Sequence, residues 1–174
     1  KLKPSKEFIL IFSGALSYLP NLDAVKYLAE EIIPMVGNLK CTFRIVGKDG
    51  DKIFGHLANE LIEVIGWTDQ YSDYHRTASA FVCPLRMGSG SKNKVLQALS
   101  FGLPVLGSEE AFSGFDTLPP GAILCKTPSD YRREIKFLIE NPSELKKLKI
   151  SSSSFMEKNF SWKKSVSILL DVSS

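Results

Sequence analysis

Short apolar runs alternate with longer segments of helical periodicity along this chain. The first run, residues 8–12, is continuous rather than alternating, as expected of a strand that is buried on both faces of a sheet. Further runs of strand length lie at residues 43–47, 62–66, 80–83, 104–106 and 122–124. Between them, apolar residues spaced by three and four positions predict helices at residues 22–36, 52–58, 71–77, 91–101, 128–139 and 142–158, with a last helix capped by Ser161.

Prolines and one glycine mark where several of these helices begin and end. Pro34 is expected to kink or end the first helix near its last turn, because it lacks an N–H group. Pro128 and Pro142 each stand in the first turn of a helix, where that loss costs little. Gly102 is well placed to end the helix over residues 91–101 in a left-handed conformation.

Repeated strand–helix units of this kind predict a doubly wound α/β domain. We expect a parallel, six-stranded, Rossmann-like sheet with helices on both faces and extra C-terminal helices, forming a single domain over residues 1–174. Ligands of such sheets bind at the carboxyl ends of the strands. The loops of interest are therefore those at residues 13–20, 47–51, 66–70, 84–91 and 107–115.

Composition places the chain among ordinary globular domains. Hydrophobic residues make up 44% of it and charged residues 24%, so it can form a core without a metal or a disulfide. A net charge of +3 is too small to favour a nucleic-acid partner. Lysines gather between residues 146 and 164, which indicates either solvated helix faces or a contact with an anionic membrane surface.

Cysteine and histidine give no sign of metal chemistry. Cys41, Cys83 and Cys125 lie far apart, in or beside apolar runs, and are interpreted as small buried residues of a reducing compartment. His56 and His75 have no metal-ligand spacing and are interpreted as surface or helix-packing residues. We therefore predict no metal and no cofactor. No run approaches the ~20 apolar residues of a membrane span, and the charged start of the chain resembles a linker within a longer protein.

The glycine-rich loop at residues 84–91 carries the strongest chemical signal. It follows a strand and opens a helix, so its backbone N–H groups and the partial positive charge of the helix start suit a diphosphate. Lys92 and Lys94 add full charges. Gln97 lies three positions after Lys94, on the same helix face, where its amide suits a ribose hydroxyl. The loop is neither a Walker A motif nor a GxGxxG motif, and a loop with solvated lysines is the structural alternative.

The order of the motifs resembles that of a known family over nearly the whole chain. IFSGALSYLPNLDAV, FRIVGK, VIGWTDQYSDYHRTASAFVCPLRMGSGSKNKVLQALSFGLPV, GSEEAFSGF and NFSWKKSV follow one another in sequence. They are similar to the C-terminal domain of GT-B-fold retaining glycosyltransferases of family 4, group 1. The resemblance implies a cytoplasmic hexosyltransferase of polysaccharide biosynthesis, either soluble or peripheral at the inner face of the membrane, with a nucleotide sugar as substrate and a membrane surface or lipid-linked acceptor as a further partner.

The same resemblance implies roles for individual residues. The loop containing Gly14 and the pair Gly66 and Trp67 would border the nucleotide, with Trp67 beside the base. Phosphate binding would fall to Arg86, Lys92, Lys94 and the backbone of Gly88, Ser89, Gly90 and Ser91. Gln97 would hold the ribose, and Glu109 would lie over the donor sugar. The family has a Glu-x7-Glu pair where this chain has Ser89 and Gln97. The remaining catalytic groups and the acceptor site would belong to an N-terminal domain outside this chain, so this domain alone would not transfer sugar.

Two further functions stay open. Ser89 and Gln97 are compatible with a degenerate module that binds nucleotide sugars without turnover. A sugar-nucleotide epimerase of the GT-B fold shares the same architecture and would need no acceptor. Transfer of the sugar to an acceptor indicates a transferase, and binding without turnover indicates the degenerate module. Conversion of the free nucleotide sugar without an acceptor indicates an epimerase.

Overall fold

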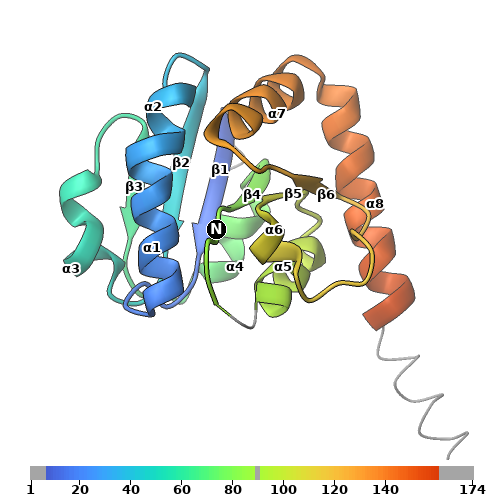
Figure 1. Ribbon diagram of the computed structural model, residues 1–174, viewed down its shortest axis with the longest axis horizontal. Coiled ribbons are helices and arrows are strands. Elements are labelled where there is room, and N and C mark those ends of the chain that lie inside the picture. The colour runs from blue at the N-terminus through green and yellow to red at the C-terminus, as the bar shows by residue number, and fades with distance from the viewer. Residues whose placement is uncertain (1–6, 89–90, 161–174) are drawn as a thin grey trace, which may run out of the picture.

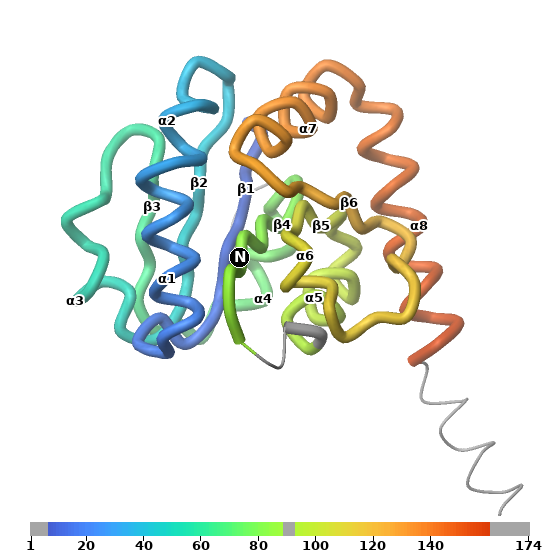
Figure 2. Tube along the Cα trace, in the orientation of Figure 1, coloured from blue at the N-terminus to red at the C-terminus, as the bar shows by residue number. Residues whose placement is uncertain are grey.

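The computed structural model describes residues 7–88 and 91–160, which form one α/β domain (Figures 1 and 2). All six strands are parallel, in the order β3-β2-β1-β4-β5-β6. The strands are β1 (Phe8–Ser13), β2 (Cys41–Val46), β3 (Ile62–Ile65), β4 (Ala80–Cys83), β5 (Val105–Gly107) and β6 (Ala122–Leu124). The predicted fold class is confirmed, and every predicted strand is present within about two residues.

Strand order reverses between β1 and β4, which pair side by side through Leu10 with Ala80 and Ile11 with Phe81. From β1 the chain proceeds to β2 and β3 in one direction, and from β4 to β5 and β6 in the other. Because such crossovers are right-handed, the two halves place their helices on opposite faces. β1 is therefore covered on both sides, and residues 9–12 are almost fully buried.

The helices follow the predicted segments with two differences. Their bounds are α1 (Leu19–Tyr27), α2 (Ile33–Val36), α3 (Gly50–Phe54), α4 (Tyr71–Arg76), α5 (Ser91–Ser100), α6 (Glu109–Phe112), α7 (Pro128–Glu140) and α8 (Pro142–Phe160). A short 3-10 turn, η2 (Gly55–Leu57), extends α3. The first difference is α6, a single turn inside the segment 107–115 that the sequence analysis treated as a loop. The Ser108 hydroxyl caps it by accepting from Ala111 N–H.

The second difference lies before Pro34. A π-helical segment, η1 (Leu28–Ile32), joins α1 to α2, and Ile33 N–H donates to the carbonyl of Leu28 rather than to the residue four positions back. This wider turn lets the chain pass through Pro34, which has no N–H to donate, before the helix ends at Val36. The predicted end of the helix near Pro34 is confirmed. The backbone accommodates the proline by forming the π-helical segment before it. The last helix expected from Ser161 lies outside the described residues.

Two C-terminal helices complete the domain. α7 packs on η1 and α2, and α8 packs along α5 (Figure 1). Gly102 and Gly121 form notches under α8: a Cβ at Gly102 would lie 2.8 Å from Ser153 Oγ, and one at Gly121 would lie 2.1 Å from Ser152 Oγ. Gly102 has φ +71°, the left-handed conformation predicted for the end of α5. We call this contact between α8 and the two glycines the α8 seam.

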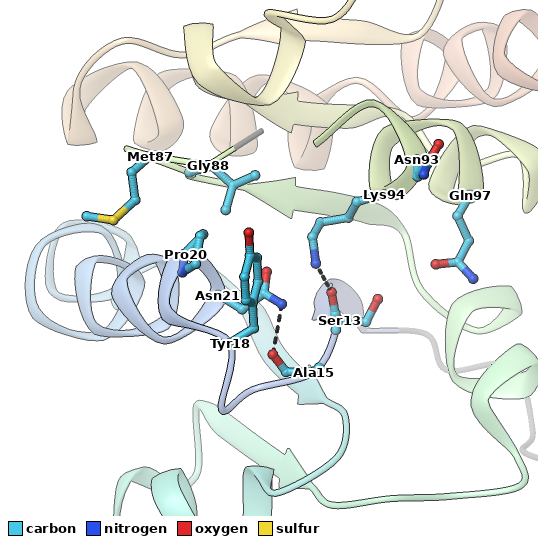
Figure 3. Close-up of a pocket in the computed structure, with 12 residues that line it drawn as sticks. Ser13, Ala15, Tyr18, Pro20, Asn21, Met87, Gly88, Asn93, Lys94 and Gln97 are labelled. Carbon is cyan, nitrogen blue, oxygen red and sulfur yellow. Dashed lines mark hydrogen bonds between the residues drawn. The ribbon is translucent and has the colours of Figure 1, made fainter. Parts of the chain in front are cut away.

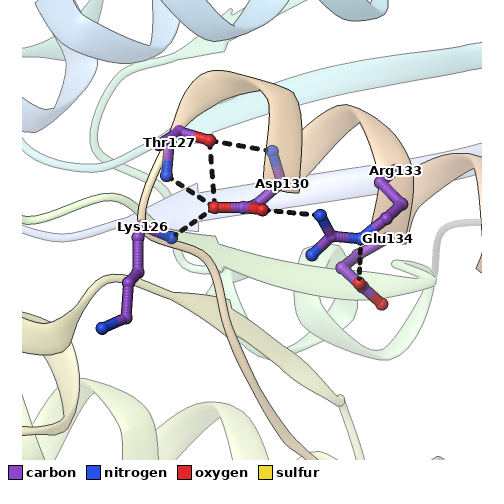
Figure 4. A network of polar contacts seen from close by, with 5 residues as sticks. All are labelled: Lys126, Thr127, Asp130, Arg133 and Glu134. Carbon is purple, nitrogen blue, oxygen red and sulfur yellow. Dashed lines mark hydrogen bonds and ion pairs between the residues drawn. The ribbon is translucent and has the colours of Figure 1, made fainter.

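The start of α7 is closed by a polar network (Figure 4). The Asp130 carboxylate accepts from the backbone N–H groups of Lys126 and Thr127 and from the Thr127 hydroxyl, and the Arg133 guanidinium donates to it over 2.6 Å. Thr127 Oγ1 accepts in turn from Asp130 N–H, which completes a capping box. The Arg133 bond and the Thr127 bonds lower the pKa of Asp130 to about 2.

Candidate functional site

A cleft of about 400 Å³ opens where strand order reverses, at the carboxyl ends of β1 and β4 (Figure 3). Its walls come from the loop after β1, the start of α1, the loop after β4 and the first turns of α5. The lining residues are Ser13, Gly14, Ala15, Tyr18, Pro20, Asn21, Leu85, Met87, Gly88, Asn93, Lys94 and Gln97. The sequence predicted a ligand site at this edge of the sheet, and four predicted residues, Gly14, Gly88, Lys94 and Gln97, line this cleft.

Close backbone contacts hold the loop after β1 at the edge of the cleft. A Cβ at Gly47 would lie 1.7 Å from the Gly14 carbonyl oxygen, so the loops after β1 and β2 touch without room for a side chain. Gly14 N–H donates to the Val46 carbonyl, and Asn21 Nδ2 donates to the Ala15 carbonyl over 2.8 Å. These bonds fix the loop after β1 against its neighbours. Gly14 and Ala15 are therefore held in place where they line the cleft.

Lys94 extends from α5 across the cleft. Its ammonium donates to the backbone carbonyl of Ser13 and lies 4.7 Å from the centroid of the Phe12 ring. Burial lowers the pKa of Lys94. Among the described residues, no carboxylate lies in ion-pair contact with this ammonium. A cation in this setting favours an anionic ligand, which would replace the missing counter-charge.

Gln97, one turn further along α5, begins a line of polar contacts into the core. The Tyr71 hydroxyl lies 3.1 Å from Gln97 Oε1 and 2.7 Å from Ser13 Oγ. Ser13 Oγ lies 3.0 Å from His75 Nε2, and His75 Nδ1 lies 2.8 Å from the Tyr71 carbonyl oxygen. His75 is fully buried, and burial is the main cause that lowers its pKa. We call these four residues the Gln97 relay.

A second cavity, of about 310 Å³, adjoins the cleft and shares Gly14 and Ala15 with it. Its other lining residues are Val46, Gly47, Lys48, Gly66, Trp67, Thr68 and Tyr71. Trp67 is 72% exposed, so it is a rim aromatic and not a core residue. A Cβ at Gly66 would lie 2.5 Å from Asp51 Oδ1, which shows how closely the loop after β3 approaches α3. The two cavities adjoin each other at Gly14 and Ala15 along the carboxyl edge of the sheet, and we call the pair the trough.

Other predicted residues lie apart from these cavities or outside the description. The Arg86 guanidinium donates twice to the Asp23 carboxylate, at 2.9 and 2.5 Å, and sits 4.7 Å from the centroid of the Tyr27 ring. Glu109 forms an exposed ion pair with Lys126 at 2.6 Å. Both residues would have to exchange these partners to bind a ligand. Ser91 begins α5, whereas Ser89, Gly90 and the side chains of Ser91 and Lys92 lie outside what the structure describes.

Sequence reasoning missed several residues that form the site. Tyr18, Asn21, Met87 and Asn93 line the cleft, although the sequence predicted no role for any of them within the motifs that contain them. His75 was interpreted as a surface or helix-packing residue without an evident partner; it is buried in α4, as packing requires, and it contacts Ser13. The spacing of Tyr71 and His75, four positions apart on one helix, places both on the face turned to the sheet. His56 is exposed, as expected.

The three cysteines are buried, as their apolar surroundings in the sequence predict. Cys41, Cys83 and Cys125 are free and buried, and burial raises the pKa of the Cys83 thiol to about 12. Within residues 7–88 and 91–160, no cluster of three or more histidine, cysteine or acidic side chains is arranged to hold a metal ion. In the same part of the chain, no helix is both long enough and apolar enough to cross a membrane.

Comparisons with solved structures show where this fold occurs. TarM of S. aureus superposes with a TM-score of 0.71 at 16% identity, over 98% of this chain and 36% of TarM. Anabaena HepE, solved with UDP-glucose, gives 0.68 at 11% identity over 89% of this chain and 45% of HepE. The C-terminal domain of the group 1 glycosyl transferase LpcC from Francisella tularensis gives 0.69 at 15% identity, over 91% of this chain and 88% of that domain. The chain thus spans less than half the length of TarM and HepE.

Sequence comparison gives the family. No curated protein sequence is similar enough to count as a relative. The family model for the glycosyl transferases group 1 matches residues 7–141, which is more than half of the chain. The matched range contains the whole sheet, both cavities and the Gln97 relay. The chain therefore belongs to the group 1 glycosyl transferase family, with the fold of the C-terminal domain of GT-B enzymes.

Proposed function

We propose that this domain binds a nucleoside diphosphate sugar in the trough formed by the two cavities. The observation that carries the proposal is the juxtaposition of Lys94 and Gln97 at the reversal of strand order. The diphosphate would lie at the start of α5, because the first N–H groups of a helix have no acceptor within the helix and Lys94 supplies a full charge. The ribose would lie by Gln97, and the base would enter the second cavity beside Trp67.

The same arrangement suits departure of a nucleoside diphosphate. Negative charge develops on the diphosphate as the bond to the sugar breaks, so a cation and a helix start at that point favour the transition state over the ground state. The Lys94 ammonium now donates to the Ser13 carbonyl, and a phosphate oxygen would be a stronger, charged acceptor. Transfer would retain the anomeric configuration and need no divalent metal.

Transfer itself would require an N-terminal domain that supplies the other wall of the cleft, the acceptor site and the remaining catalytic groups. HepE and TarM are each more than twice as long as the part that matches this chain. Positioning two reactants in one cleft can supply on the order of 7–11 kcal/mol of barrier lowering. We place the complete protein in the cytoplasm, either soluble or peripheral at the membrane, as a hexosyltransferase of polysaccharide biosynthesis.

One observation favours a second function. Ser89 and Gln97 replace the family's paired carboxylates, and an amide oxygen accepts a ribose hydroxyl more weakly than a carboxylate does. A module that binds nucleotide sugar without turnover is the alternative on that ground.

A binding screen and a turnover assay test the proposal. Thermal-shift measurements with UDP, GDP, ADP and their sugars should identify one nucleotide class that stabilises the domain. Donor consumption should then be undetectable for this domain and measurable for a protein that includes the N-terminal domain. Stabilisation by none of the nucleotides contradicts the proposal, and binding without consumption by the longer protein favours the binding module. Donor conversion without any acceptor indicates an epimerase.

A further inference from the structure

The Gln97 relay joins the exposed edge of the cleft to the core of the domain. Gln97 is exposed, Tyr71 is half-buried, and Ser13 and His75 are buried. The His75 ring stacks on Phe101 with centroids 4.8 Å apart and is tilted against Tyr71 at 4.3 Å. A polar line of this kind costs desolvation in a core where apolar residues would pack without that cost.

The donor and the acceptor of each hydrogen bond within the relay follow from the proton that each group carries. The Tyr71 carbonyl can only accept, so His75 carries its proton on Nδ1 and donates there. At neutral pH His75 is neutral, because the ordinary pKa of histidine already lies below that pH and burial lowers it further. Its Nε2 is then an acceptor, which requires the Ser13 hydroxyl to donate to it. The Ser13 oxygen keeps only its acceptor role, so the Tyr71 hydroxyl donates its single proton to Ser13.

This direction decides how the Gln97 amide is turned. As placed, Gln97 Oε1 faces the Tyr71 hydroxyl at 3.1 Å, with Tyr71 as donor. The Tyr71 hydroxyl donates its single proton to Ser13, so it has none left for Gln97. The Tyr71 oxygen and Gln97 Oε1 would then face each other without a proton between them and repel. The oxygen and nitrogen of an amide differ little in shape, and their assignment follows from the hydrogen-bond network. With the amide turned over, its NH₂ group donates to Tyr71, and every member of the relay is satisfied.

We propose that Tyr71, Ser13 and His75 are positioning residues that hold the Gln97 amide with its oxygen directed to the cleft. In that orientation Gln97 is an acceptor for a ribose hydroxyl, and it discriminates nucleotides that have the hydroxyl from those that lack it. The inference rests on the proposed function, because it assigns the ribose of the bound nucleotide to Gln97. Ser13 also links the two ligand-facing side chains, since its carbonyl accepts from Lys94 while its hydroxyl belongs to the relay.

Ribose discrimination tests the relay. Titration calorimetry of the chain should show UDP binding about tenfold more tightly than 2′,3′-dideoxy-UDP, the scale of one or two good hydrogen bonds. Both Gln97→Ala and Tyr71→Phe should remove most of that preference. Tyr74→Phe removes a hydroxyl that lies on the same helix but outside the relay, so the preference for UDP over the dideoxy analogue should be unchanged. The inference is overturned if Tyr71→Phe keeps the whole preference for UDP over the dideoxy analogue, or if the unsubstituted chain has no such preference. Either result leaves the proposal of nucleotide binding intact.

The state of His75 gives an independent readout. Imidazole ¹⁵N chemical shifts should show a neutral ring protonated at Nδ1, and the Nε2 shift should change in Ser13→Ala. A ring protonated at Nε2, or at both nitrogens at neutral pH, overturns the direction of the relay. This spectrum needs no ligand. If UDP does not bind at all, the proposed function fails for a uridine donor and the spectrum still decides the relay.

Discussion

At the scale of single residues, the site depends on two side chains that differ in how they are held. Lys94 and Gln97 both line the cleft from one face of α5, as their spacing predicted, while Val95 and Leu99 are buried on the other face. The spacing could not predict that Lys94 would reach the Ser13 carbonyl, because that contact depends on the last residue of β1, 81 positions earlier in the chain. The relay was missed for the same reason: its members meet only through tertiary structure.

Lys94→Ala and Gln97→Ala should each weaken nucleotide binding by about 1–2 kcal/mol, since each removes one polar or charge-assisted contact. Neither should unfold the domain, because the apolar face of α5 is untouched. Titration calorimetry with the nucleotide that binds best measures the loss, and Lys147→Ala, an exposed lysine on α8, is the control. Unchanged affinity in both variants would make the glycine-rich segment a purely structural loop.

His75 should make the stability of the domain depend on pH. Its pKa is lowered in the folded state, so below the unfolded value of about 6.5 the unfolded chain binds more protons. The free energy of unfolding should therefore fall as pH drops from about 6.5 to 5, by at most ~1.4 kcal/mol per pH unit. Urea unfolding across this range measures the slope. His75→Gln should flatten it, whereas His56→Gln, at an exposed site, should leave it in place; equal slopes in all three proteins would contradict the prediction.

At the scale of elements, the sequence predicted what local patterns decide. Continuous apolar runs located all six strands, and Pro128 and Pro142 marked the starts of the last two described helices. α6 was missed because four residues are too few to show a helical period, and only the Ser108 cap defines it. The π segment before Pro34 was also missed, since the proline indicates a disturbance without saying how the backbone absorbs it.

The capping box of α7 makes a direct prediction at this scale. Thr127→Ala should lower the free energy of unfolding by about 1 kcal/mol, because the Asp130 N–H loses its acceptor at the helix start. Thr127→Ser keeps the hydroxyl and should restore most of the stability. Urea unfolding at neutral pH compares the three proteins. Full stability in Thr127→Ala would mean that the remaining bonds of the Asp130 carboxylate, to two backbone N–H groups and to Arg133, are enough to close this end of the helix.

At the scale of the whole molecule, strand order is what creates the site. Parallel strands with alternating helices predicted a doubly wound sheet, and the reversal between β1 and β4 brings residues 13–21 against residues 85–97. Family membership is the ground for proposing a nucleotide sugar as the ligand of this trough, although Ser89 and Gln97 depart from the family's acidic pair. The hydrophobic pattern alone predicted the fold and the edge of the sheet at which a ligand would bind. The proposal of a sugar nucleotide as that ligand required the order of the family motifs.

The α8 seam has a mechanical consequence. α8 packs along α5 and against Gly102 and Gly121, so it supports the helix that presents Lys94 and Gln97, and the two helices should move together as one rigid body. Gly121→Ala places a methyl group 2.1 Å from Ser152 Oγ at a φ of +90°, which should lift α8 from its support. Amide hydrogen exchange should then quicken in both α8 and α5, while Gly55→Ala, where nothing lies within 4 Å, should leave exchange unchanged. Faster exchange confined to α8 would show that α5 keeps its place without the brace.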